Sequence, residues 1–460
     1  MSRRSLRRRS PARLKGGFGL AALASVTVLT LAACGGSSSS SSPGTASTSS
    51  VGSTTSGSIV WSASPLSGTG ANDARTVLIN AFEKQYPNIK VTLVSAPTDT
   101  DTNRATLATQ IAGGATTPDV FMGDVIWPAQ FGAHQLAVPL SSYLPSSYWS
   151  RFATGLVAGA TYKGQVYGSP LFEDQGFLFY RKDLLSKDKL PVPTTWEQLE
   201  SDAKAVLAKG QAKYGFVWQG DSYEGLTCNF MEYLTDAGGT ATNSGYTQAT
   251  LNSAAALKAV TFMRSLVTSG VTPAAVTTFQ EPQAMNTFGG GNAVFIRNWD
   301  YAYSTSITPA DGGKLTASQV GVEPLPTFAG QPAPGYSNIG GWNMYINPHS
   351  KHLGADLTFI QWLSSTAGQD ILSQKYGFIS TLTAVRSSPA VVSSNPVFAI
   401  VPKTKLVPRP AGTPQYPALS TAIYTNVNAA LAGSSSPAAA VAAMQSAANA
   451  ALSSTSNGGL

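Results

Sequence analysis

Charged side chains are scarce in this chain of 460 residues, in which Asp, Glu, Lys and Arg make up 12%, against roughly 25% in an average soluble domain. Acidic residues are absent before Asp73, whereas seven of the 30 Lys and Arg residues stand in the first 15 positions. Without these seven, 23 basic residues balance 23 acidic ones, so the net charge of +7 belongs to the N-terminal tip. A chain without a broad basic surface is not expected to bind nucleic acid.

Cysteine and histidine are also rare, with two Cys and three His in the whole chain. If Cys34 is modified, Cys228 has no partner, and an intramolecular disulfide is excluded in the mature protein. Cys228 lies in an apolar run and is expected to be a buried, inert thiol. His349 and His352 have a spacing that would suit a metal on a helix, but no Cys or acidic cluster accompanies them. We expect no metal and no cofactor.

Sequence motifs for catalysis are missing as well. The chain has neither a phosphate-binding Gly-rich loop nor a Gly-x-Ser-x-Gly elbow. Glu173 and Asp174 would be candidates for an acid–base pair, but neighbours in an extended segment point to opposite sides. These absences favour a binding protein and leave an enzyme with carboxylates paired in space as an alternative.

The N-terminus has the layout of a secretory signal peptide over residues 1–33, because a basic tip is followed by an apolar run too short to favour a spanning helix. The run ends in Leu31-Ala32-Ala33-Cys34, which resembles the lipobox of bacterial lipoproteins. We expect a lipid on Cys34; the alternative is an ordinary signal peptide with an unrelated Cys. Residues 34–58 are mostly Ser, Thr and Gly and are expected to form a flexible tether. The protein would then be lipid-anchored at the extracellular face of the bacterial cell membrane.

The remaining residues have hydrophobic patterns that alternate between strand and helix periods, which predicts an α/β fold with a mostly parallel, covered sheet. Thr194 and Thr195 offer a helix N-cap, with Glu197 at the capping-box position. Two similar α/β halves indicate two lobes, with crossings near residues 168–170 and 324–326. The strands are predicted at residues 59–61, 89–93, 119–122 and 214–218, and the helices at 72–86, 102–112, 194–209, 251–267, 351–363, 416–431 and 436–452.

Aromatic and polar residues interleave beside glycine at several expected strand ends. A sugar presents hydroxyl groups around its edge and C–H groups on its faces, so it requires charged or amide side chains together with flat aromatic rings. Open α/β sheets bind ligands at such strand ends, which favours a carbohydrate site over a purely structural role for these rings. The segments are residues 123–127, 171–174, 297–301 and 340–343.

The motifs in these segments resemble those of the extracellular solute-binding lipoproteins of carbohydrate ABC importers, the maltose-binding-like family, and more narrowly its trehalose/maltose-binding branch. The resemblance rests on the order and combination of short motifs from about Ile59 onward. They lie at residues 118–127, 164–174, 179–183, 218–220, 223–228, 288–293 and 340–343.

The resemblance implies a two-lobed periplasmic-binding-protein-like fold of type II with the ligand cleft between the lobes. By analogy, residues 59–165 and 327–376 form the N-lobe, and residues 166–326 and 377–460 form the C-lobe. It also implies a monomer that delivers a small-molecule carbohydrate to ABC permease subunits, with the ATPase on a separate protein.

The resemblance further assigns ligand contacts to individual residues. Asp124 and Asp174 match sugar-binding carboxylates of the two lobes, and Phe172 stands where the branch often has a Tyr. The family's N-terminal acidic contact is not found, because residues 68–71 are Gly-Thr-Gly-Ala. The other implied contacts are Trp299, Tyr301, Gly341, Trp342, Arg104, Arg409 and Glu224.

Three functions therefore compete. The leading hypothesis is a transport receptor that closes on a disaccharide or short oligosaccharide of the trehalose/maltose type, without chemistry. The alternatives are a secreted glycoside-active enzyme and a receptor of the same fold for another solute, such as a polyol, a phosphorylated polyol or a peptide.

Overall fold

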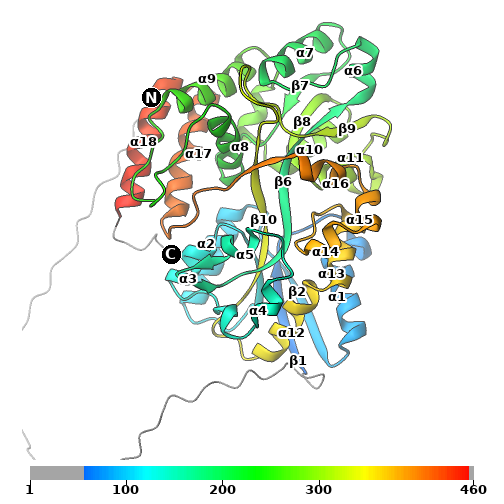
Figure 1. The fold of residues 1–460 in the computed structure, drawn as a ribbon, viewed down its shortest axis with the longest axis vertical. Helices are drawn as coiled ribbons and strands as arrows, with labels where there is room; N and C mark the ends of the chain where they lie inside the picture. Colours follow the sequence, from blue (N-terminus) through cyan, green and yellow to red (C-terminus); the bar gives the residue numbers. More distant parts are fainter. Residues whose placement is uncertain (1–55, 455–460) are drawn as a thin grey trace, which may run out of the picture. The chain divides into compact units, whose positions relative to one another are not determined.

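Residues 56–454 are described by the computed structural model, and their strands form one large sheet and one small hairpin (Figure 1). Nine strands form the large sheet in the order β2-β1-β3-β10-β6-β8-β7, with β11 beside β10 and β9 beside β6, while β4 and β5 form the hairpin. The strands are β1 (Gly57–Ala63), β2 (Ile89–Ser95), β3 (Val120–Asp124), β4 (Thr161–Tyr162), β5 (Gln165–Val166), β6 (Ser169–Arg181), β7 (Tyr214–Val217), β8 (Ala293–Trp299), β9 (Val320–Glu323), β10 (Tyr336–Ile346) and β11 (Lys405–Val407).

The large sheet is mixed, so the expectation of a mostly parallel sheet is wrong. β1 pairs in parallel with β2 and β3, and β7 with β8. β10 is antiparallel to β3 and β6, and β6 is antiparallel to β8 and β9. Local hydrophobic patterns show that a strand is buried on both faces but do not reveal its direction.

The two longest strands, β6 and β10, connect the halves of the sheet and lie side by side in Figure 1. The first part of β6 pairs with β10, and its second part pairs with β8 and β9. β10 pairs with β11 at its start and with β3 at its end. The expected crossing at residues 168–170 meets the start of β6. The second long strand begins at Tyr336, after the expected segment 324–326.

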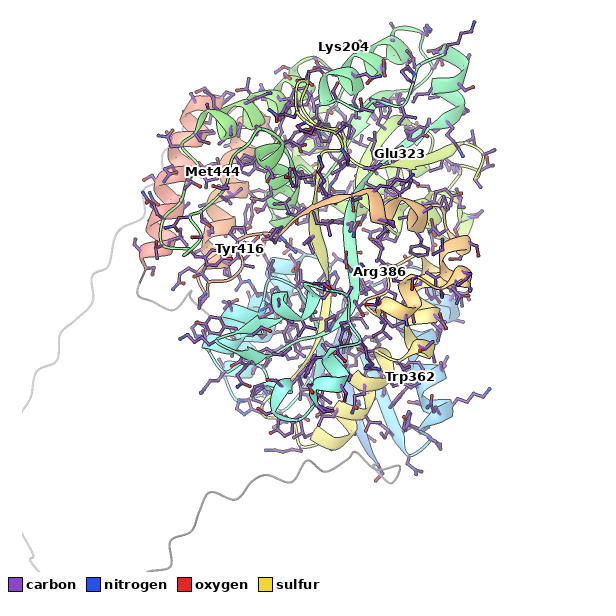
Figure 2. The ribbon with its side chains drawn as sticks, in the orientation of Figure 1. Lys204, Glu323, Trp362, Arg386, Tyr416 and Met444 are labelled. Atoms are coloured by element: carbon purple, nitrogen blue, oxygen red, sulfur yellow. The ribbon has the colours of Figure 1, made fainter. Side chains whose placement is uncertain are left out.

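The two faces of the sheet belong to two hydrophobic cores, because successive strand residues point to opposite sides. Phe177 and Phe179 pack in one core, and Leu178 and Tyr180 pack in the other. The first core includes residues of α1 (Ala74–Gln85) and α12 (Leu353–Leu363), and the second includes residues of α8 (Glu224–Asp236), α9 (Ala254–Thr268), α17 (Tyr416–Ala432) and α18 (Pro437–Ser453). Figure 2 labels Trp362 on α12 from the first core and Met444 on α18 from the second. Both faces of the sheet are therefore covered, as the sequence predicted.

The helices expected at residues 72–86, 102–112, 194–209 and 251–267 are found within three residues at each end, whereas periodicity did not predict the helices Glu224–Asp236 and Glu281–Gly289. Asp73 caps α1 by accepting a hydrogen bond from Arg75 N, and Asp99 caps α2 by accepting one from Thr102 N. The helices of the chain up to β8 are η1 (Gly70–Asn72), α1 (Ala74–Gln85), α2 (Thr100–Ala112), α3 (Pro128–Ala133), η2 (Leu140–Ser142), α4 (Ser146–Trp149), α5 (Leu156–Gly159), α6 (Lys182–Asp188), α7 (Trp196–Ala208), α8 (Glu224–Asp236), α9 (Ala254–Thr268), η3 (Ala274–Thr278) and α10 (Glu281–Gly289).

After β8, the longest helices are α17 and α18, which pack against each other. No helix of residues 56–454 is both long and apolar enough to cross a membrane. The helices of this part are α11 (Ala302–Ile307), η4 (Pro309–Asp311), α12 (Leu353–Leu363), α13 (Thr366–Asp370), the π-helix η5 (Ile371–Lys375), α14 (Thr383–Arg386), α15 (Pro389–Ser394), α16 (Val397–Ile400), η6 (Val401–Lys403), α17 (Tyr416–Ala432) and α18 (Pro437–Ser453).

The start of α7 differs in detail from the expected capping box. Thr195 is the N-cap and accepts a hydrogen bond from Gln198 N at 3.2 Å. The Gln198 side chain in turn accepts a hydrogen bond through its Oε1 from the backbone N–H of Thr194, at 3.1 Å. Glu197 instead accepts from Ala329 N at 2.9 Å. The carboxylate thus ties the helix to a distant loop, which the local sequence could not reveal.

Candidate ligand-binding site

A cavity of about 360 Å³ lies where β6, β8 and β10 meet the loops of both halves of the sheet. β3 contributes Met122 and Asp124, and β6 contributes Phe172 and Asp174. The centre of β10 contributes residues 340–342, and α8 and α10 contribute their first residues. Residues far apart in the sequence therefore build one polar and aromatic site.

Nine of the ten predicted ligand-contact residues line this cavity; their role in binding stays a prediction. The exception is Arg104 on α2, which is absent from the lining and donates a hydrogen bond to Gln130 Oε1 at 3.2 Å. The nine lining residues are Asp124, Phe172, Asp174, Glu224, Trp299, Tyr301, Gly341, Trp342 and Arg409.

Arg409 connects two carboxylates from different elements. It donates to Asp124 Oδ1 of β3 at 2.9 Å and to Glu224 Oε1 of α8 at 2.8 Å. Glu224 also accepts hydrogen bonds from Tyr416 and Ser420 at the start of α17 (Tyr416 is labelled in Figure 2). Burial raises the pKa of Glu224, and the positive charge of Arg409 opposes that rise. Because all three charged groups are buried, each depends on the others for neutralisation.

Asp174 and Glu173 point to opposite sides of β6, as their adjacency predicts. Glu173 is bound by Arg386 of α14 and by Gln175 Nε2 at 2.6 Å (Arg386 is labelled in Figure 2). Asp174 lines the cavity, and burial raises its pKa to about 7. The two carboxylates therefore do not flank one bond together, and Asp174 is the one that a ligand can meet.

The Trp299 ring is held from two directions. Its Nε1 donates to Glu281 Oε1 at 3.3 Å, and the guanidinium carbon of Arg297 lies 4.0 Å from the ring centroid. Tyr223 donates from its hydroxyl to the other oxygen of Glu281 at 2.7 Å. These contacts fix an aromatic surface at the cavity wall, which suits the apolar face of a sugar ring.

A second aromatic group combines two predicted residues with one from outside the motifs. The rings of Phe172 and Phe378 lie 4.4 Å apart, and those of Tyr301 and Phe378 lie 5.7 Å apart, between centroids. All three rings line the cavity. The site thus has a broad apolar surface beside its carboxylates.

Glycine is required at the centre of β10. Gly341 has φ +118°, and a Cβ there would lie 2.5 Å from Phe172 O. A Cβ on Gly340 would lie 3.1 Å from Trp299 and 3.2 Å from Asp174 Cβ. The glycine pair therefore lets Asp174 and Trp299 approach the β10 backbone, which explains why the sequence has two glycines before Trp342.

Other lining residues were not predicted as contacts. Tyr223 and Glu281 hydrogen-bond to each other but are 58 positions apart, so no local motif connects them. Ser67, Gly68 and Thr69 also line the cavity, which places neutral groups in the segment that lacks the expected acid. A signal for Glu281 would have been its place at the first position of a helix, where a carboxylate is favoured by the helix dipole.

His349, His352 and Cys228 lie within the described residues, whereas the leader does not. Within residues 56–454, no cluster of three or more His, Cys, Asp or Glu side chains could hold a metal ion. His352 precedes α12, and its Nδ1 lies 3.1 Å from Asp119 Oδ1. Cys228 is buried at the cavity, and burial raises the pKa of its thiol. The predicted signal peptide, Cys34 and nearly all of the tether lie outside the described residues.

Comparison with known families decides the class of this protein. Residues 68–370 match the family model of bacterial extracellular solute-binding proteins. The chain belongs to this family. It is a solute-binding protein of the ABC-transporter class, and the family works in an extracellular or periplasmic location.

Two curated relatives of this solute-binding protein cover most of its length. A probable ABC transporter-binding protein of Deinococcus radiodurans is 31% identical over 368 residues, which are 78% of this chain and 85% of the relative. A mannitol-binding protein of Pseudomonas aeruginosa is 25% identical over 316 residues, which are 68% of this chain and 70% of the relative.

Solved structures confirm the predicted two-lobed type II fold. Maltose-bound MalE3 of Thermotoga maritima has a TM-score of 0.76 and 32% identity, covering 85% of this chain and 98% of its own. The GacH receptor of Streptomyces glaucescens, solved unliganded and with acarbose, has a TM-score of 0.75 and 26% identity, covering 86% and 98%. The maltose-binding-like family predicted from the motifs is thereby confirmed.

Proposed function

We propose that this solute-binding protein captures a disaccharide or short oligosaccharide of the maltose or trehalose type in its cavity and delivers it to a membrane permease. The single observation that carries the proposal is the combination of fixed aromatic rings and buried carboxylates around one cavity. Rings such as Trp299 offer surfaces for the C–H faces of a sugar, and carboxylates such as Asp174 accept hydrogen bonds from its hydroxyl groups. The relatives solved with maltose and acarbose support a sugar ligand.

The charge of the cavity argues for a neutral ligand. Asp124, Asp174, Glu224, Glu281 and Asp311 line it, whereas Arg409 is the one Lys or Arg side chain among its described lining residues. Arg409 is already bound to two of the carboxylates. A phosphate or carboxylate on the ligand would meet further negative charge without a free cation, so we expect sugar phosphates and phosphorylated polyols to be rejected.

Capture would work by closure without chemistry. The lobes would be residues 59–165 with 327–376 and residues 166–326 with 377–460, and β6 and β10 would connect them. A ligand that contacts both lobes interacts better with the closed state and shifts the protein towards it. The protein would act as a monomer, anchored through a lipid on Cys34 and served by permease and ATPase subunits on other chains.

A second candidate is a receptor for a polyol, and the mannitol-binding relative favours it. A polyol has the hydroxyl groups that the carboxylates require, but it has no pyranose face to stack on Trp299 or Trp342. The aromatic lining therefore favours the sugar.

The two candidates are separated by a thermal-shift panel of the purified protein with maltose, trehalose, mannitol and glucose 6-phosphate. A ligand that binds the folded state raises the unfolding midpoint. We expect a rise with maltose or trehalose, none with glucose 6-phosphate and no release of glucose during incubation. A rise with mannitol alone would favour the polyol receptor, and release of glucose would favour an enzyme.

A further inference from the structure

Asp174 and Asp300 form a pair of carboxyl groups at the wall of the cavity. Asp174 is 5% exposed and lines the cavity from β6, whereas Asp300 is fully buried directly after β8. β6 and β8 are antiparallel, and Gly176 opposite Trp299 is the last pair of their register, so Asp174 and Asp300 both lie within two residues of that pair. Their side chains are close enough to hydrogen-bond to each other if one of them is protonated. Two carboxyl groups in such contact cannot both be ionised at low cost, so one of them holds a proton.

The surrounding arginines do not neutralise this pair. Each is engaged with other carboxylates: Arg297 with Glu232, Arg386 with Glu173, and Arg409 with Asp124 and Glu224. Three acidic groups act on Asp174 by charge. Asp124 of β3 and Glu173 of β6 have arginine partners, whereas Glu281 of α10 accepts hydrogen bonds from the neutral side chains of Tyr223 and Trp299. The hydroxyl of Tyr301 adds a neutral group. The field around the pair is therefore negative, which favours a bound proton.

The hydrogen bonds show where that proton is needed. Asp300 Oδ2 accepts from Ile379 N at 2.8 Å. If both groups were ionised, Asp174 Oδ1 and Asp300 Oδ1 would have no donor within the described part of the chain. A proton on Asp300 supplies a donor for Asp174 and removes the repulsion between them. Consistent with this, burial and the neighbouring Asp174 raise the pKa of Asp300 well above its ordinary range.

We propose that Asp300 is a positioning residue, which keeps its proton and donates a hydrogen bond to Asp174, so that Asp174 is held as an ionised acceptor for a hydroxyl group of the ligand. The link to the ligand rests on the proposed function, whereas the shared proton does not. Loss of the proton at alkaline pH would place two negative charges side by side, so both stability and ligand affinity should fall there.

The proton is tested without any ligand, by unfolding midpoints from pH 5 to pH 9 for the wild type and Asp300→Asn. Asn keeps an oxygen for Ile379 N and has an N–H for Asp174, but it does not titrate. The pKa of Asp300 is higher in the folded protein than in the unfolded chain, where an Asp has a pKa of about 3.9. The proton on Asp300 therefore contributes stability that is complete at low pH and is lost as the pH rises above that value. We expect the wild-type midpoint to fall more steeply than that of Asp300→Asn. The unfolding midpoint of a surface control, Glu200→Gln, should depend on pH as that of the wild type does. If the midpoints of the wild type and Asp300→Asn depend on pH in the same way, the proposal is wrong.

The positioning role is tested with maltose as the probe. We expect Asp300→Ala to weaken maltose binding at least tenfold at pH 8, where Asp174 is ionised, and Asp300→Asn to recover most of that loss. We also expect wild-type affinity to fall between pH 8 and pH 10, where Asp300 loses its proton, more than the affinity of Asp300→Asn. Equal affinities of Asp300→Ala and wild type would overturn the role. If the wild type does not bind maltose, the sugar proposal fails, while the unfolding midpoints still decide about the proton.

Discussion

Asp174 is the residue whose contacts give the most direct prediction for binding. It is buried at the cavity wall, on the long central strand β6. Its Oδ1 has no hydrogen-bond donor among the described residues, apart from a contact with Asp300. We expect Asp174→Asn to weaken maltose binding by about 2 kcal/mol, or roughly 30-fold, because a charged acceptor is lost. Titration calorimetry measures the change.

The control for this substitution is Glu200→Ala. Glu200 forms an ion pair with Lys204 on α7, with 2.7 Å between Glu200 Oε1 and Lys204 Nζ. Glu200 does not line the cavity. This variant should bind maltose as the wild type does. Unchanged affinity in a folded Asp174→Asn protein would remove Asp174 from the site.

Gly341 gives a second prediction, for stability. Its φ of +118° and the approach of Phe172 O leave no room for a side chain. Gly330 has a similar positive φ of +85°, but a Cβ there meets nothing within 4 Å. We expect Gly330→Ala to cost about 1 kcal/mol through backbone strain and Gly341→Ala to cost about 3 kcal/mol, since strain and overlap add. Urea unfolding compares them, and equal costs would show that the Phe172 contact does not matter.

Among the elements, Arg409 connects β3 with α8, and this contact predicts a pH-dependent stability. Arg409→Met leaves Asp124 and Glu224 buried without their cation, which should cost about 3–5 kcal/mol. Arg409 lowers the pKa of Glu224, so its removal raises that pKa further. Protonation then relieves the loss, and the cost should be larger at pH 8 than at pH 5.

Urea unfolding at the two pH values checks this prediction. Lys204→Met breaks a surface pair and should cost less than about 1 kcal/mol at either pH. A cost for Arg409→Met that is small, or that is larger at pH 5, would contradict the account of the Arg409 contacts.

The elements also show how far the sequence allowed prediction. Helices such as α1, α9 and α17 have a regular apolar period and were predicted within a few residues, as were β1 and β2. The direction of β6 and β10 was not predictable, because antiparallel pairing of strands 160 or more positions apart leaves no local pattern. The same reason explains the missed pair Tyr223 and Glu281, whereas Asp174 and Trp342 lay in motifs that could be recognised.

At the scale of the whole molecule, buried aspartates predict how stability depends on pH. Burial raises the pKa of Asp101, Asp236 and Asp356 to about 7. In the folded state these groups keep protons that the unfolded chain releases above about pH 4. Their contribution to stability is therefore complete below about pH 4 and is lost as the pH rises towards 7.

The expected result is an unfolding midpoint that falls from pH 5 to pH 8. Asp356→Asn should reduce this fall, because Asn cannot titrate while its side-chain oxygen can still accept from Ser350 Oγ. Asp73 and Asp183 have lowered pKa values and affect stability in the opposite sense, below about pH 4. A midpoint that rises between pH 5 and pH 8 would contradict this account.

The central claim is that the protein captures a sugar in its cavity without transforming it. Titration calorimetry of the wild-type protein with maltose, followed by recovery of the sugar, tests it most directly. We expect one molecule of maltose bound per chain and intact maltose afterwards. Absence of binding to maltose and to trehalose, or recovery of glucose, would contradict it.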